Sequence, residues 1–441
     1  MTTKTPQHLK EIVADILERA QRSGATAAEV SASTSQNLSV AVRMGDIDTL
    51  EHGRDQGLCL TVYLGNRTGT AEASGFAPAD IAKLVTEAIN IAKYTGEDSY
   101  AGLADATDMA VEIPDLQLYH PWTIDTADAI ELVGECEAIA RAEPLIVNSE
   151  GAQLSTTQST YCYGNTHNFN AAYQGTRHSI SCSVVAGRNG AMQRDMWFDN
   201  RRNAQHLQSI EVIGRLAAQR AIQRLDASKV HSCKVPVLFT PETAISLIGH
   251  FTSAISGGAL YKGTSFLPDT LNTRVFPEFV QLVEQPRQPG GLYSAPFDDE
   301  GVATRDQVIV ANGVVKNYIL DSYAARRLAM QTTANGGGLR NVTVDGGHQS
   351  FEGLVKEMNK GLVVTELIGM GVNQITGDYS RGASGFWVEN GKIDHPVEEI
   401  TIADNLRKMY ANIVALGNDT DERHNIRCGS ILIGEMAISG I

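Results

Sequence analysis

The sequence lacks the features that define several common classes of protein. No apolar run is long enough to cross a bilayer, and the first residues, MTTKTPQHLKEIVADILERA, show neither the apolar core nor the cleavage site of a secretory signal. The six cysteines are scattered and include no CxxC pair, which is typical of reduced thiols in the cytoplasm. Lys and Arg number 36 against 51 Asp and Glu, for a net charge of −15. We therefore expect a cytoplasmic protein that binds neither nucleic acid nor membranes.

The motifs of several enzyme classes are also missing. There is no GxxxxGK[ST] phosphate loop, and the glycines at 369 and 371 lack the third glycine of a dinucleotide fingerprint. The segment GASG at 382–385 is one residue short of the GxSxG elbow of serine hydrolases. No HExxH motif is present and no two histidines are four or five residues apart, so no predicted helix offers two imidazoles on one face for zinc.

The chain has the composition of a globular protein, with 42% apolar and 20% charged residues over 441 positions. Its first half twice shows the order helix, meander of strands, helix. Apolar residues at helical spacing predict the helices, and alternating apolar residues predict the strands. The predicted helices are 7–23, 78–94, 126–142 and 209–226. The predicted strands are 30–33, 38–43, 47–51, 57–63, 146–153, 159–163, 169–174 and 178–186.

After residue 231 glycines become frequent and strands alternate with turns, with helices predicted only near 241–256, 321–330 and 404–414. The expected fold class is α+β, with N-terminal and middle helix/antiparallel-sheet layers followed by a β-rich C-terminal domain. The predicted division is an N-terminal domain at 1–95, a linker at 96–124, a middle domain at 125–230 and the C-terminal domain at 231–441.

The stretch 361–393 combines an apolar strand, a glycine-punctuated polar segment at 376–385 and a second strand that ends in an Asn-Gly turn. Glycine permits a positive φ or a close approach of the backbone to another group. We interpret the polar segment as a loop between two strands. It either holds a ligand, a peptide or another subunit, or it is a tight connection that satisfies its own backbone. The candidate substrate or partner contacts are Asp378, Tyr379, Ser380 and Arg381.

Other chemistry-bearing residues have a common structural explanation as well as a functional one. Four side chains of types that bind metals lie on consecutive predicted strands: Cys162, His167, His178 and Cys182. Such residues are more often ordinary strand residues than metal ligands. The acidic run 298–300 could hold a cation, although a solvated turn is more usual. His250, at the end of an apolar helix, and Cys428, a lone cysteine, are each more often packing residues than ligands.

Several motifs in a fixed order point to one family. They are FDxEG at 297–301, YKGTSF at 261–266, GLVVTEL at 361–367, TGDYSRG at 376–382, GFWVENG at 385–391 and CGS at 428–430. Through nearly its whole length the sequence resembles the TldD/PmbA family, and specifically its PmbA/TldE branch.

The resemblance implies a subunit of a cytosolic two-chain metallopeptidase. In such pairs the TldD-type chain carries an HExxxH helix, whose histidines hold zinc with a cysteine near the C-terminus while the glutamate activates water. The pair is implicated in trimming small peptides, including antibiotic precursors and an antitoxin, and older descriptions call its members modulators of DNA gyrase.

Carried over residue by residue, the resemblance places the HExxxH window at 248–253, where IGHFTS offers neither the second histidine nor the glutamate. Only Cys428 matches a metal-holding position. We therefore expect this chain to have no catalytic or metal site of its own, zinc being held by a TldD-type partner. The chain would help to form a chamber for unfolded peptides, lined by the segment 376–391 and by strand edges of the C-terminal domain. We expect an extended peptide to add to an exposed strand edge there. A homodimer is an option without the partner.

Two alternatives remain open from the sequence. The chain is a metallopeptidase in its own right if Cys428 combines with His250 or His424 in an unrecognised site. Otherwise it is a regulatory binding protein, acting without proteolysis on a topoisomerase or a toxin–antitoxin system.

Overall fold

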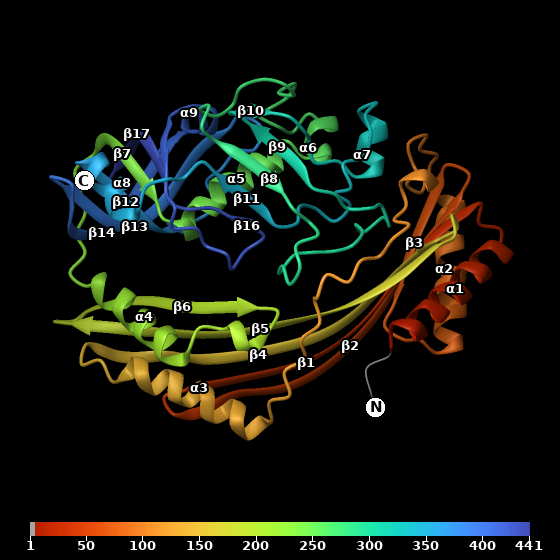
Figure 1. Cartoon of the computed structure of the whole chain (residues 1–441), viewed down its shortest axis with the longest axis horizontal. Helices are drawn as coiled ribbons and strands as arrows, with labels where there is room; N and C mark the ends of the chain where they lie inside the picture. Colours follow the sequence, from red (N-terminus) through yellow and green to blue (C-terminus); the bar gives the residue numbers. More distant parts are fainter. Residues whose placement is uncertain (1–4) are drawn as a thin grey trace.

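A computed structural model describes residues 5–441 of the chain. One antiparallel sheet of long strands organises the N-terminal half, in the order β3-β2-β1-β4-β5-β6. Figure 1 shows this sheet as a curved layer below the C-terminal half. Its strands are β1 (Ala27–Arg43), β2 (Asp46–Leu64), β3 (Arg67–Ala73), β4 (Ile146–Asn165), β5 (Phe169–Arg188) and β6 (Ala191–Arg201).

Several strands that were predicted as two short consecutive segments are single long strands in the structure. The predicted strands 30–33 and 38–43 are both parts of β1, and the polar residues 34–37 between them pair with β2 on one side and β4 on the other. Backbone hydrogen bonds on both edges keep this polar stretch extended, although its sequence has no strand pattern. One sheet therefore contains strands from both sides of the predicted linker at 96–124. The division into an N-terminal and a middle domain stays a prediction.

All four long helices of this half cover the same face of the sheet. The pair α1 (Pro6–Arg22) and α2 (Pro78–Tyr94) packs on one end, and α3 (Thr126–Arg141) and α4 (Ile210–Gln223) pack on the other. The β1 side chains beneath them have even numbers, such as Val30 under the first pair and Val40 under the second. Because side chains alternate along a strand, the odd positions face the C-terminal half.

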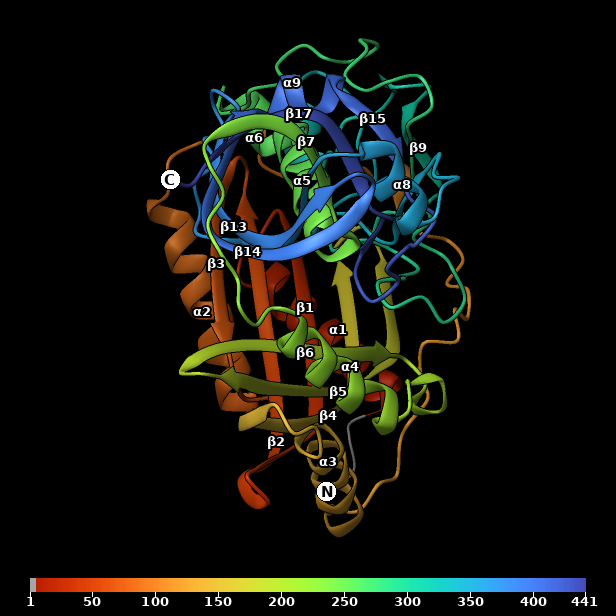
Figure 2. The same ribbon diagram turned by 90° about the vertical axis from the view of Figure 1, so that its left-hand side faces the viewer.

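In the C-terminal half, five strands close into a ring, β14-β13-β12-β7-β17, because the end of β17 pairs with β14. Figure 2 shows β13 and β14 curving beneath β7 and β17. The strands are β7 (Cys233–Phe239), β12 (Gly361–Ile368), β13 (Asp378–Glu389), β14 (Lys392–Asn405) and β17 (Ile431–Ser439), with β15 (Ile413–Leu416) paired on β17.

A second, smaller sheet has the order β10-β9-β8-β11-β16. Its strands are β8 (Gln281–Glu284), β9 (Gln307–Ala311), β10 (Val314–Val315), β11 (Val342–Asp345) and β16 (Ile426–Arg427). The helices of this half are α5 (Pro241–Ala254), α6 (Gly257–Tyr261), α7 (Ser322–Arg327), α8 (Phe351–Met358) and α9 (Leu406–Ala411). Short 3-10 turns lie at Ala106–Asp108 and Ala204–His206.

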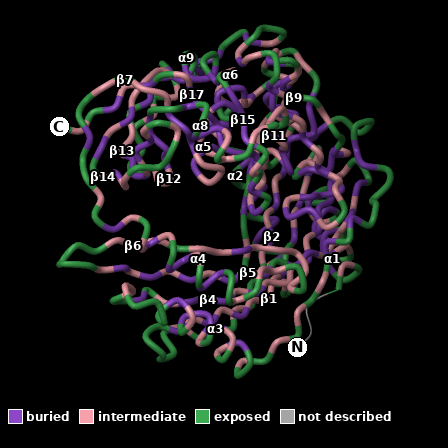
Figure 3. Tube along the Cα trace, turned by 60° about the vertical axis from the view of Figure 1, so that its left-hand side comes forward, coloured by how far each residue is buried: buried purple, intermediate pink, exposed green. Residues whose placement is uncertain are grey.

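The ring packs a helix on each face. Val237 and Phe239 of β7 join the core around α5, whereas Leu238 between them packs with α8. Figure 3 shows buried residues gathered in this half and along the sheet below. The expected α+β class, with a β-rich C-terminal part, is confirmed.

The interpretation of 376–385 as a loop is wrong for most of its length, because β13 begins at Asp378. Its glycines let β13 approach β12: a Cβ on Gly385 would lie 1.9 Å from the Val363 carbonyl oxygen. The actual turn is at Gly377, where φ is +80°. The glycines thus mark close strand contact, together with a register shift beside Gly385 and the turn at Gly377.

The acidic turn at 298–300 joins the two halves through Asp298, which is buried, and Glu300, which is partly buried. Phe297 packs against Phe169 and Tyr173 of the lower sheet. The Asp298 carboxylate accepts backbone N–H groups of Glu300, Val302 and Gly336. Glu300 accepts both the N–H and the hydroxyl of Ser322. Only Asp299 is exposed, and it pairs with Arg340 at 3.1 Å, so a solvated turn describes one residue of the three; within residues 5–441 no metal-binding group is formed here.

Burial raises the pKa of Glu300 to about 7 from an ordinary 4.5, and this makes stability depend on pH. The unfolded chain loses this proton first, so the free energy of unfolding falls as pH rises from about 4.5 to about 7. Glu300→Gln keeps an oxygen that can accept from Ser322 but cannot ionise. We expect it to gain up to about 3 kcal/mol on the wild type between pH 4 and pH 8 in urea denaturation. Glu278→Gln, at an exposed carboxylate, is the control, and parallel pH profiles for Glu300→Gln and wild type would contradict the assignment.

Candidate functional site

The four predicted contacts on β13 lie on two opposite faces of the strand. Tyr379 is 1% exposed and Arg381 is half-buried, and both face α5. Asp378 and Ser380 are exposed on the other face. Hydrogen bonds from Thr376 and Asn405 hold the Asp378 carboxylate and lower its pKa, so this residue fixes the adjacent turn. The four predicted contacts therefore form two pairs in the structure: Tyr379 and Arg381 on one face of β13, and Asp378 and Ser380 on the other.

Tyr379 and Arg381 form a polar cluster with His250 of α5 and Gln374. The rings of Tyr379 and His250 meet edge to face, with centroids 6.3 Å apart. The Gln374 amide nitrogen lies 3.1 Å from His250 Nδ1, and donation to that atom leaves the imidazole proton on Nε2. His250 Nε2, Gln374 Oε1, Tyr379 Oη and Arg381 Nε are all buried without a hydrogen-bond partner among residues 5–441.

The protonation states in this cluster follow from burial. Burial lowers the pKa of His250, and the nearby Arg381 charge lowers it further. Burial also raises the pKa of Tyr379 to about 12, although Arg381 opposes that change. At neutral pH the cluster therefore presents a neutral imidazole, a phenol and one guanidinium. Such donors suit a carbonyl or a carboxylate oxygen, and leaving them unpaired costs about 1–3 kcal/mol each.

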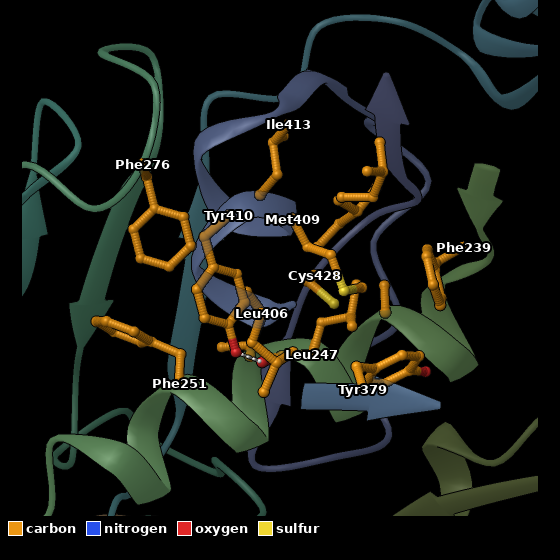
Figure 4. Close-up of a cluster of buried hydrophobic side chains, with 14 of the residues drawn as sticks. Phe239, Leu247, Phe251, Phe276, Tyr379, Leu406, Met409, Tyr410, Ile413 and Cys428 are labelled. Atoms are coloured by element: carbon orange, nitrogen blue, oxygen red, sulfur yellow. Dashed lines mark hydrogen bonds between the residues drawn. The ribbon is translucent and has the colours of Figure 1, made fainter. Parts of the chain in front are cut away.

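The residues of α5 and Cys428 do not fit a zinc site. In the 248–253 window, Ile248 and Phe251 are buried apolar side chains, and His250 is the one metal-type donor. Cys428 lies among apolar side chains of the core (Figure 4), and its thiol donates to the Pro241 carbonyl at 3.9 Å. Burial raises the pKa of this thiol, and Asp421 raises it further, whereas zinc requires a thiolate.

The other metal-type side chains are held apart by separate partners. Cys162 and Cys182 lie in different apolar cores. His178 is held between the Thr156 hydroxyl and the His120 carbonyl, and His167 lies 3.1 Å from the Ala104 carbonyl. His424 packs edge-on against Phe198. Within residues 5–441 no three His, Cys, Asp or Glu side chains are placed to hold a metal ion.

Sequence reasoning missed a polar face on the lower sheet. The odd positions of β1 and β4 carry short polar side chains that are partly exposed towards the C-terminal half; they include Ser31, Ser35, Ser39, Thr157 and Ser159. A signal for it was present, because small polar residues alternate with apolar ones along both strands. Gln374 was missed because its partner His250 is distant in sequence.

An ion-pair network links this sheet to the ring. Arg224, just after α4, contacts Glu366 of β12 and donates to the Ser384 hydroxyl of β13 at 3.0 Å. Asp195 of β6 lies 3.5 Å from the same guanidinium. The polar face and β13 are therefore held in a fixed relation.

Comparison with known proteins identifies this architecture. Models of the PmbA/TldA metallopeptidase domain 1, central domain and C-terminal domain match residues 28–92, 119–225 and 232–440. The chain belongs to this PmbA/TldD family of metallopeptidases. It is 43% identical to Metalloprotease PmbA of Escherichia coli O157:H7, over 98% of this chain and 96% of that protein.

Solved structures agree with this assignment. A Bacteroides thetaiotaomicron protein described as a candidate modulator of DNA gyrase superposes with a TM-score of 0.93 at 26% identity, covering 99% of this chain and 100% of that one. TldE from Thermococcus kodakarensis shares the fold, with a TM-score of 0.83 at 20% identity, over 97% of this chain and 100% of that one. No helix within residues 5–441 is long and apolar enough to span a membrane.

The burial of Cys428 predicts a thiol that does not react in the folded protein. At pH 8, iodoacetamide should leave Cys428 unmodified in the native chain but modify it fully in urea, because the thiolate is the nucleophile. The half-exposed Cys233 is the matched control and should react in both states. Mass spectrometry of the peptides reads both sites. Native modification of Cys428 at the rate of Cys233 would mean an accessible thiolate.

Proposed function

We propose that this chain is the subunit of a TldD/TldE-type zinc metallopeptidase that holds no zinc itself. The zinc, held by a TldD-type partner, would supply the activated water, and this chain would help to present unfolded peptides. The observation that carries the proposal is the donor set of α5 and its surroundings. A single neutral imidazole stands in the window where the resemblance places two histidines and a glutamate, and Cys428 is a buried thiol.

Two surfaces support a role in peptide binding. The hydroxyl-rich odd face of β1 and β4 can pair with backbone N–H and C=O groups of any peptide, since hydroxyls both donate and accept. The cluster of His250, Gln374, Tyr379 and Arg381 adds donors for a carbonyl or carboxylate. Recognition of backbone groups with little side-chain preference suits a peptidase of unfolded peptides.

The expected addition of a peptide to a strand edge does not apply to β13. This strand pairs with β12 on one side and β14 on the other, so it has no open edge. Contact with a peptide there would use side chains such as Tyr379 and Arg381. We also propose, from the sequence, that the chain works in the cytoplasm and can form a homodimer when the partner is missing.

Elemental analysis of the chain purified alone, without chelator or a metal-affinity step, tests the proposal directly. We expect zinc near zero per chain because the donors do not converge. Cleavage of a denatured peptide should require this chain together with a TldD-type chain. One zinc per chain, or cleavage by this chain alone, would overturn the accessory role. A pair that does not cleave would favour a regulatory binding protein.

Arg381→Ala should lower kcat/KM of the reconstituted pair by about 10- to 100-fold, the loss expected for a charge-assisted hydrogen bond to substrate. The reason is that Arg381 is the one cation of the buried cluster. Ser380→Ala, on the exposed face of the same strand, is the control and should stay near wild type. Size-exclusion chromatography of the pair must show intact assembly. Unchanged cleavage by Arg381→Ala would remove this residue from the site.

A further inference from the structure

A cavity of about 410 Å³ lies away from β13, where the linker, the end of β6, the loop at 286–295 and the segment before β16 meet. Its charged and titratable lining consists of His120, Arg201, Arg202, His206, Glu422 and Arg427. Cavities of this size accommodate small ligands or the end of a peptide. The proposed peptidase role does not assign it a ligand.

The lining is cationic in a protein whose net charge is −15. The lining holds three guanidiniums and one carboxylate, Glu422, which is 62% exposed and 3.6 Å from Arg201; the buried Asp199 behind the lining also pairs with Arg201, at 3.1 Å. Arg202 is a fixed cation, because its nitrogens donate to the carbonyls of Thr176, Gly291 and Leu292. The cavity therefore concentrates positive charge where water is partly excluded.

Arg427 is the least satisfied of these cations. Its Nη1 donates to the Gln288 amide oxygen at 2.8 Å, whereas its Nε is buried without a partner among residues 5–441. No carboxylate of the described chain forms an ion pair with it. Burial lowers its pKa, the charge of Glu422 opposes this change, and the charge of Arg201 lowers the pKa further. A half-buried guanidinium with this environment gains from an anion that fills the cavity.

We propose that this cavity binds an anionic oxygen group, a carboxylate or a phosphate, with Arg427 as its main ligand. The planar fork of arginine matches both groups through paired N–H donors, which a lysine cannot reproduce. Arg201 and Arg202 add to the positive potential, and His120 and His206 are further lining residues. The source of the group is either a free oxyanion or the C-terminal carboxylate of a peptide, and these have different experimental signatures.

The first measurement is binding of inorganic phosphate to the full chain by calorimetry and by thermal shift, with ionic strength held constant by NaCl. We expect saturable binding by wild type, weakened at least about tenfold in Arg427→Gln, as for one lost charge-assisted contact. Arg407→Gln removes the same charge from an exposed site and should bind like wild type. Arg427→Lys, which retains charge and bulk, should also bind weakly and serves if the glutamine variant does not fold.

The second arm uses a fluorescein-labelled decapeptide with either a free C-terminal carboxylate or a C-terminal amide, read by fluorescence anisotropy. Tighter binding of the carboxylate form, lost in Arg427→Gln and kept in Arg407→Gln, assigns the cavity to peptide ends. Equal binding of the two forms, with phosphate binding retained, assigns it to a free oxyanion. If neither phosphate nor the peptide carboxylate distinguishes wild type from the Arg427 variants, the proposal is wrong. None of these binding measurements depends on zinc content or cleavage. A failure of this proposal can therefore be distinguished from a failure of the proposed peptidase function.

Discussion

The backbone pairing of β14 with β17 is the constraint on which the C-terminal half depends. Three residues of β14, 401–403, pair with 437–439 of β17 and close the ring. Closure holds β14 in place, and β13, paired between β12 and β14, has no free edge and turns Tyr379 and Arg381 towards α5 while Ser380 faces out. A closed ring also removes the exposed edges that favour aggregation. The position of the buried polar cluster is thus a consequence of strand pairing far along the chain.

The same alternation gives the lower sheet two different faces. Even positions of β1, such as Val30 and Val40, are buried under the helices, and odd positions such as Ser35 stay partly exposed. The turn at Phe297 and the Arg224–Glu366 pair then fix this polar face against the ring. Side-chain alternation along the strands therefore separates the apolar residues that stabilise the protein from the polar residues that we propose contact a peptide.

Local patterns predicted most of the helices, because α1, α2 and α5 each carry an apolar stripe and begin with proline, but they missed α8 and the short α6. Local patterns failed where pairing with neighbouring strands decides whether a segment is strand or loop. The polar residues 34–37 are strand only because both neighbours bond to them, and the glycines of β13 suggested a loop although they permit close contact with β12. For the site, Tyr379 and Arg381 could be proposed from the motif. Gln374 and Arg427 could not, because burial and missing partners are three-dimensional properties.

The structure also explains how α5 is stable without metal donors. A structural or catalytic zinc contributes binding energy where charged ligands converge. Here Leu247, Ile248 and Phe251 pack α5 into the largest apolar core, and Cys428 belongs to that core as a neutral thiol. Two of the buried polar atoms without a partner among residues 5–441, Arg381 Nε beside α5 and Arg427 Nε next to Cys428, belong to cations. Because unpaired buried cations are costly, their retention in an acidic protein argues for anionic groups that arrive from outside the chain.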